Sequence, residues 1–195
     1  KISRDEMMQK LASDGFAPEA TRFSCDGIIL NAAAVPIQKT EFFENGFLRI
    51  QDEAAQLVSC LIKPEGDDTV LDACAGAGGK ATHLAAIFKN KGQIVAVDRN
   101  PERIAELRQE TTRLGIKIIE ADTVDLSADL PDSLKEKFDH VLVDAPCSGL
   151  GTLRRNPEIK WRITQKDVHD FTAAQKAILQ NASSAVKKGG CLIYC

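Results

Sequence analysis

The sequence predicts an α/β fold with a doubly wound, mostly parallel sheet, preceded by a small α+β segment. From residue 69 onward, strand-like apolar runs alternate strictly with helical patterns, which implies right-handed crossovers between parallel strands. A glycine-rich loop joins the first of these strands directly to a helix. Residues 1–45 lack this alternation, so we expect a small N-terminal unit there and a second domain at 46–195.

The N-terminal unit opens with a helical pattern over residues 4–12. Ser3 stands at its N-cap position and Glu6 follows three residues later, as in a capping box. Residues 27–30 are strand-like. Residues 51–62 have a helical apolar pattern that Pro64 and Gly66 bring to an end.

The second domain contains five expected strands and three expected helices. Pro101 follows Asn100 as the first residue of a helix that Gly115 ends, and the run 187–190 (Lys-Lys-Gly-Gly) is expected to end the last helix. The expected strands span 69–73, 93–97, 116–120, 140–144 and 191–194, and the expected helices span 80–89, 101–114 and about 165–186.

Composition excludes several classes of protein. The 195 residues are 44% hydrophobic and 27% charged, which is typical of a globular chain. A net charge of −3 argues against nucleic-acid binding through bulk positive charge but permits a local basic patch. No apolar run approaches the ~20 residues of a membrane span. The six cysteines form no CxxC pair and no zinc-ligand spacing with histidine, so we expect a reducing, cytoplasmic setting and no metal.

The glycine-rich loop at 74–80 predicts a nucleotide-binding site. Gly76, Gly78 and Ala81 fit the pattern G-x-G-x-x-G/A after a strand and at the start of a helix. Asp98 ends the next strand, twenty residues after Gly78, where a carboxylate can accept hydrogen bonds from ribose hydroxyls. The alternative is a structural turn with Asp98 as an N-cap. The loop alone does not separate NAD from S-adenosylmethionine, although the lack of Arg and Ser favours the methyl donor.

Two carboxylates and a thiol follow later strands. Asp122, after the third expected strand, could face an adenine amino group or lie in a solvated turn with Asp125. The fourth strand ends in Asp144-Ala145-Pro146-Cys147-Ser148-Gly149, at the sheet edge where α/β folds bind ligands. Cys147 is either a reactive thiol or a small buried residue.

A basic segment at 154–166 follows this cysteine. It holds five basic residues and one acid, together with Trp161, the only tryptophan. Basic side chains beside an aromatic ring suit a phosphate backbone and an unstacked base. The alternative is an ordinary solvated face.

Together these residues resemble the Sun/Nop family of RNA cytosine-5 methyltransferases. The resemblance is carried by stretches 46–57, 72–80, 98–103, 144–149 and 154–157, with Lys160 and Trp161. The family loop reads Asp-x-Cys-Ala-Ala-Pro-Gly-Gly-Lys-Thr, whereas this chain has Gly76, Ala77 and Ala81 at three of those positions. These replacements stay small, so backbone contacts to a cofactor should survive.

The resemblance implies a Rossmann-like class I methyltransferase sheet and an RNA-recognition-like unit at 1–45. Asp98 would bind the ribose of S-adenosylmethionine with support from Arg103, Asp122 would bind its adenine end, and Asp144 would lie between the methyl group and the target cytosine. The cofactor loop would be Cys74, Ala75, Gly76, Ala77, Gly78, Gly79 and Lys80, and the contacts to ribosomal or transfer RNA would come from Arg154, Arg155, Lys160 and Trp161.

The resemblance also predicts the catalytic thiols. The attacking cysteine would lie two positions beyond Cys195, so we expect this chain to be truncated and inactive by itself, with Cys147 assisting product release. In related DNA enzymes a cysteine like Cys147 is itself the attacker, which remains an alternative. Two other classes stay open: an NAD-dependent oxidoreductase using the same loop, and a non-catalytic RNA-binding scaffold.

Overall fold

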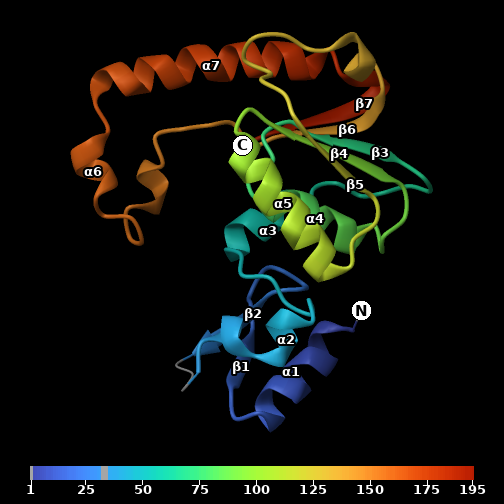
Figure 1. Ribbon diagram of the computed structural model, residues 1–195, viewed down its shortest axis with the longest axis vertical. Coiled ribbons are helices and arrows are strands. Elements are labelled where there is room, and N and C mark those ends of the chain that lie inside the picture. Colours follow the sequence, from blue (N-terminus) through green and yellow to red (C-terminus); the bar gives the residue numbers. More distant parts are fainter. Residues whose placement is uncertain (1, 32–34) are drawn as a thin grey trace.

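The computed structural model describes residues 2–31 and 35–195. Figure 1 shows a small N-terminal part beside a larger sheet covered by helices. The N-terminal part contains a two-stranded antiparallel sheet, formed by β1 and β2, against which α1 packs. Its elements are α1 (Arg4–Ser13), β1 (Ala17–Ala20), β2 (Ile28–Asn31), η1 (Ile37–Lys39) and α2 (Glu41–Glu44).

The larger part is built on a five-stranded sheet in the order β5-β4-β3-β6-β7, with every neighbouring pair parallel. The chain order reverses beside β3, which lies between β4 and β6. A crevice for ligands opens at such a switch point, outside the carboxyl ends of the strands. This confirms the predicted doubly wound α/β fold. The strands are β3 (Thr69–Asp72), β4 (Gln93–Asp98), β5 (Ile119–Thr123), β6 (Phe138–Val143) and β7 (Val186–Tyr194).

Helices cover both faces of this sheet, because successive strand residues point to opposite sides. Val70 contributes to a core shared with the helices α4 and α5, whereas Leu71 belongs to a second core shared with α7. Both side chains are fully buried. The helices are α3 (Glu53–Ser59), α4 (Gly79–Ile87), α5 (Pro101–Leu114), α6 (Ile159–Arg162) and α7 (Gln165–Ser183), with short η2 (Asp132–Leu134) and η3 (Leu150–Thr152) turns.

Local signals placed several helix ends correctly. Ser3 and Glu6 form the expected capping box at α1. Helix α5 has the predicted bounds, with Asn100 as its N-cap and Gly115 as its C-cap in the left-handed conformation (φ +68°). Both caps satisfy backbone groups that the helix itself leaves unpaired, so they act on the ends whatever the tertiary context.

Other boundaries differ from the sequence prediction. Strand β1 was not expected, α3 is shorter than the predicted 51–62, and β5 begins three residues after the predicted 116. The last helix stops at Ser183, and residues 187–190 belong to β7 instead of ending the helix. Strand β7 pairs with β6 at Val186 and again from Cys191, and in the irregular stretch between them Lys187 contacts the Asp139 carboxylate at 2.9 Å. Among the described residues, no helix has both the length and the apolarity needed to cross a membrane.

Candidate active site

The glycine-rich loop runs from β3 into α4 and is held by Asp98 at the end of β4. One Asp98 oxygen accepts the N–H of Gly76 at 2.9 Å, and the other accepts the N–H of Asn100 at 2.8 Å. Asn100, not Asp98, caps α5. Asp98 therefore fixes the loop from the neighbouring strand, and the alternative in which it serves as the helix N-cap is wrong.

The two glycines that define the loop have different neighbours. Both adopt left-handed backbone conformations, with φ +53° at Gly76 and +80° at Gly78. A Cβ at Gly78 would lie 2.0 Å from the Leu107 side chain on α5, whereas a Cβ at Gly76 would meet nothing within 4 Å. Gly78 is thus needed for helix packing, and Gly76 leaves open space beside the loop.

A cavity of about 200 Å³ lies at the carboxyl ends of the strands, beside this loop. Three carboxylates (Asp98, Asp125 and Asp144) and the cation Arg99 are among its lining residues. The excess of acids suits a ligand with a positively charged centre. The remaining lining residues are Ala73, Cys74, Val124, Leu126, Ser127, Pro146 and Ile178.

Two residues expected in the cofactor site pair with side chains of α5. The Asp122 carboxylate lies 3.5 Å from the Arg108 guanidinium, with 71% of the Asp122 side chain exposed. Asp122 lies inside β5, which runs to Thr123, and Asp125 lines the cavity at the carboxyl ends of the strands. Arg103 is expected to support Asp98. In the structure its guanidinium instead donates a hydrogen bond to Glu106 on the same helix, at 2.9 Å.

Lys80 and Asp144 form an ion pair across the crevice, from the start of α4 to the end of β6. Lys80 is mostly buried, with 14% of its side chain exposed. The pairing places a cation from the glycine-rich loop beside the carboxylate that was expected to face the target base. Sequence reasoning predicted both residues, but only the fold brings them together.

Asp72 is a site residue that sequence reasoning missed. It ends β3, is 1% exposed, and neither carboxylate oxygen has a well-aligned hydrogen-bond partner. Burial raises the pKa of Asp72 to about 7, and the nearby Lys80 charge only partly opposes this. The available signal was an acid as the last residue of an apolar strand, directly before a glycine-rich loop.

Three cysteines, Cys74, Cys147 and Cys195, follow strands at this edge of the sheet. Burial and the charges of Asp72 and Asp98 raise the pKa of Cys74 to about 12. Burial and Asp144, whose carboxylate lies 3.6 Å from the Cys195 sulfur, raise the pKa of Cys195 to about 11. Both thiols stay protonated at neutral pH, so neither is a ready nucleophile. Cys147 and Cys195 are both exposed, whereas Cys74 is half-buried.

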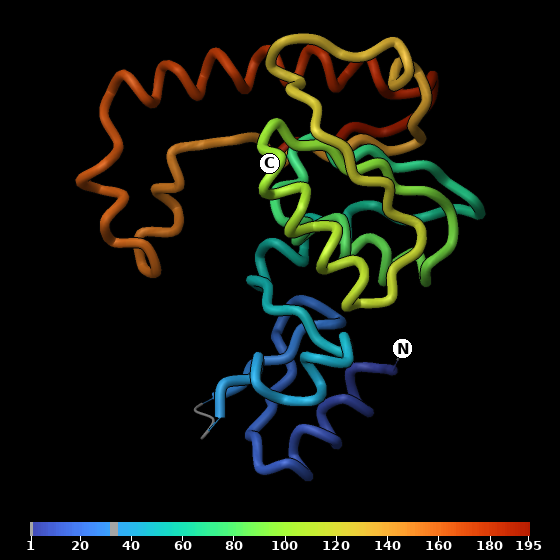
Figure 2. The backbone as a smooth tube through the Cα atoms, in the orientation of Figure 1, coloured from blue at the N-terminus to red at the C-terminus, as the bar shows by residue number. Residues whose placement is uncertain are grey.

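The basic segment loops away from the sheet between Cys147 and α7. Figure 2 shows this excursion and its return into the long helix. Arg155 forms an ion pair with Asp52, the N-cap of α3, which ties the segment back to the body. Trp161 is 81% exposed, and the Lys160 ammonium lies 4.9 Å from its ring centroid.

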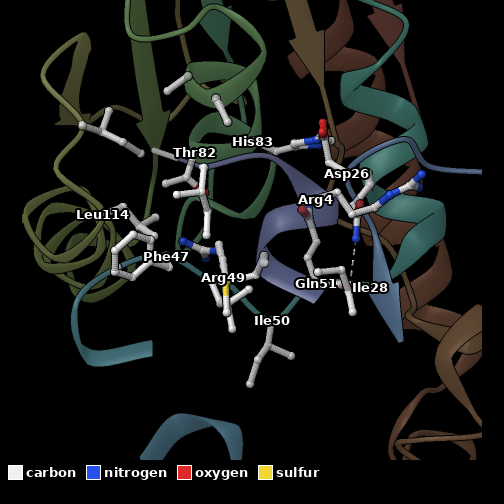
Figure 3. Close-up of a pocket in the computed structure, with 18 of the residues that line it drawn as sticks. Arg4, Asp26, Ile28, Phe47, Arg49, Ile50, Gln51, Thr82, His83 and Leu114 are labelled. Carbon is white, nitrogen blue, oxygen red and sulfur yellow. Dashed lines mark hydrogen bonds and ion pairs between the residues drawn. The ribbon is translucent and has the colours of Figure 1, made fainter. Parts of the chain in front are cut away.

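A second, larger cavity of about 710 Å³ lies between the N-terminal part and α4. Figure 3 shows Arg49, Gln51, His83 and Asp26 in its wall. Arg49 donates to the Ala77 carbonyl at 2.8 Å and forms an ion pair with Glu110. The wall of this cavity is therefore connected to the back of the glycine-rich loop.

Comparison with solved structures identifies the class. The crystal structure of PH0851 superposes with a TM-score of 0.92 at 32% identity, covering 100% of this chain and 44% of that one. A methyltransferase homolog protein from Pyrococcus horikoshii superposes with a TM-score of 0.85 at 29% identity, covering 100% and 60%. Fold and site thus define a Rossmann-like methyltransferase.

Sequence comparison then identifies the family. Residues 59–195 match the family model of the 16S rRNA methyltransferases RsmB/F, and the chain belongs to this family. It is 38% identical over 194 residues to the probable ribosomal RNA small subunit methyltransferase B of Bacillus subtilis (strain 168). That match covers 100% of this chain and 43% of the relative, so the chain spans less than half the length of this relative. The comparisons confirm the predicted Sun/Nop resemblance and give no support to the oxidoreductase alternative.

Proposed function

We propose that this chain carries the site that transfers a methyl group from S-adenosylmethionine to carbon 5 of a cytosine in ribosomal RNA. The observation that carries the proposal is the meeting of two elements at one sheet edge. The loop held by Asp98 and the Asp144–Cys147 turn both leave the sheet at the switch point. A cofactor in the crevice would therefore lie beside a candidate base-binding carboxylate and an exposed thiol.

The crevice fits S-adenosylmethionine better than a dinucleotide. Each Asp98 oxygen accepts one backbone N–H and retains a lone pair, so the carboxylate can also accept from ribose hydroxyls. The other two cavity acids, Asp125 and Asp144, complement the positive charges of the cofactor and would repel a pyrophosphate. When bound, S-adenosylmethionine supplies an electrophilic methyl group on a sulfonium sulfur.

The protein residues around the crevice have distinct roles in this proposal. The Asp144 carboxylate, held by Lys80, accepts a hydrogen bond from the exocyclic amino group of cytosine and so orients the ring. A cysteine thiolate adds to carbon 6, which makes carbon 5 nucleophilic enough to take the methyl group. Loss of the carbon-5 proton and elimination of the thiolate then restore the aromatic ring.

Cys147 is assigned to the elimination step, as the resemblance implies. It is exposed and directly follows Pro146, which lines the crevice. The attacking thiolate would come from the position that the family pattern places two residues after Cys195. The basic segment with Trp161 would hold the flanking single-stranded RNA, through its basic side chains and by stacking of a base on the indole ring.

Two experiments test the proposal separately. Isothermal titration of the chain with S-adenosylmethionine, its demethylated product and NAD should show binding of the first two ligands only. Binding of NAD without binding of S-adenosylmethionine would overturn the cofactor assignment. In the full-length protein, Cys147→Ala should accumulate a covalent protein–RNA adduct on a denaturing gel. Loss of adduct formation would make Cys147 the attacker.

A further inference from the structure

The segment between β1 and β2 docks against α3 through a buried serine. Ser24 is 2% exposed, and its backbone N–H donates to the Glu53 carboxylate at 3.0 Å. The Ser24 hydroxyl lies 2.6 Å from Oε1 of Gln56, one turn further along the helix. These contacts fix residues 23–26 on one face of α3.

The same segment is also fixed to α4. The Asp26 carboxylate lies 3.4 Å from Nε2 of His83, whose side chain is only 8% exposed, and Figure 3 shows the two groups facing each other. Arg4 of α1 adds a hydrogen bond to the Ser24 carbonyl at 3.2 Å. Residues 24–26 therefore join α1, α3 and α4, although they lie in a loop.

Two cysteines lie at this junction. Cys25 stands between the anchored Ser24 and Asp26 and is exposed. Cys60, the C-cap of α3, is four residues beyond Gln56 and so follows it on the same face of the helix. Burial raises the pKa of Cys60, and the neighbouring Cys25 and Asp26 raise it further. The docked loop thus brings Cys25 to the end of α3 that Cys60 caps, although the two residues are 35 positions apart in sequence.

We propose that Cys25 and Cys60 are an oxidation site that closes to a disulfide by exchange with a low-molecular-weight disulfide such as oxidised glutathione. The Cys25 thiolate attacks one glutathione sulfur, the glutathione S–S bond breaks, and one glutathione leaves as its thiolate. Cys60 then loses its proton to solvent and attacks the Cys25 sulfur of the mixed disulfide, which expels the second glutathione. Two protein thiols are oxidised and one glutathione disulfide is reduced to two thiols.

The disulfide would lock the N-terminal part onto the methyltransferase domain. Helix α3 carries Cys60 at one end and Asp52, the partner of Arg155 in the basic segment, at the other. It also packs on α4, which starts at the glycine-rich loop. A cross-link from Cys25 would restrain this junction without using Cys147, which the proposed reaction needs.

The test treats the full chain with oxidised glutathione and maps the products by tandem mass spectrometry. Fragmentation is required because one tryptic peptide, 50–80, contains both Cys60 and Cys74. We expect a Cys25–Cys60 linkage with loss of two hydrogens, and a Tm higher by about 5–10 °C that dithiothreitol reverses. Cys25→Ser should lose both effects, and the matched control Cys191→Ser, which removes another exposed cysteine, should keep both.

Several outcomes would overturn this proposal. Glutathione retained on Cys25 as a stable mixed disulfide would show that Cys60 cannot reach it. A linkage of Cys25 to Cys74 or any other cysteine would show that the pairing is wrong. A Cys25–Cys60 linkage with unchanged Tm would show that the cross-link does not restrain the docked loop.

Discussion

Replacing Asp98 with alanine tests the cofactor site most directly. The carboxylate holds Gly76 and Asn100 by hydrogen bonds of 2.9 and 2.8 Å and retains one lone pair on each oxygen for the ribose hydroxyls. Two hydrogen bonds to a charged acceptor contribute about 1.5–3 kcal/mol each, part of which the released hydroxyls recover from water. We expect a net loss of about 2–4 kcal/mol in S-adenosylmethionine binding, or roughly 30- to 700-fold in Kd.

Isothermal titration of the wild-type chain and of Asp98→Ala measures this difference. Circular dichroism must show that the variant is folded, since the Gly76 anchor is lost as well. Asp132→Ala is the matched control, because Asp132 is a surface carboxylate paired only with nearby Lys135. Its Kd should equal the wild-type value. Unchanged affinity in a folded Asp98→Ala protein would refute the assignment of Asp98 to the ribose.

Three further predictions follow from the same contacts. Gly78→Ala should lower the free energy of unfolding, measured by urea denaturation, by about 2–4 kcal/mol because the added Cβ meets the Leu107 side chain. Gly76→Ala places its Cβ in open space and should lower the same free energy by only about 1 kcal/mol. The folded pKa of Asp72, about 7, lies above the unfolded value near 4, so stability should fall as pH rises between them. Asp72→Asn should remove this pH-dependent loss of stability, and at pH 8 the variant should be more stable than the wild type by about 2–4 kcal/mol. An unchanged dependence of stability on pH would show that the buried Asp72 carboxyl does not cause it. Trp161→Ala should weaken binding of single-stranded ribosomal RNA in fluorescence anisotropy by about 1–3 kcal/mol, with Trp161→Phe near wild type; equal loss in both would argue against stacking.

The main fold could be predicted because its signals are local and periodic. Strands β3 and β4 and helix α5 combine an apolar pattern with end signals such as Pro101 and Gly115, which act within one turn. Strand β7 could not be predicted in full. Its first half contains two lysines and two glycines, and the register with β6 is irregular there, where Lys187 reaches Asp139 on that strand. Such a contact joins residues 48 positions apart, so no local pattern reveals it.

For the candidate site, too, the sequence determined some features and the tertiary structure determined others. By itself, the sequence determined that a glycine-rich loop, Asp98, Asp144 and Cys147 follow strand ends, because parallel strands bring their carboxyl ends to one edge. Only the tertiary structure decided that Lys80 pairs with Asp144, that Asp125 lines the crevice, and that the Asp72 carboxyl is buried. The reason is that strand register and side-chain burial depend on neighbours distant in sequence. Spacing along the chain specifies which residues reach an edge, whereas packing specifies which of them face one another there.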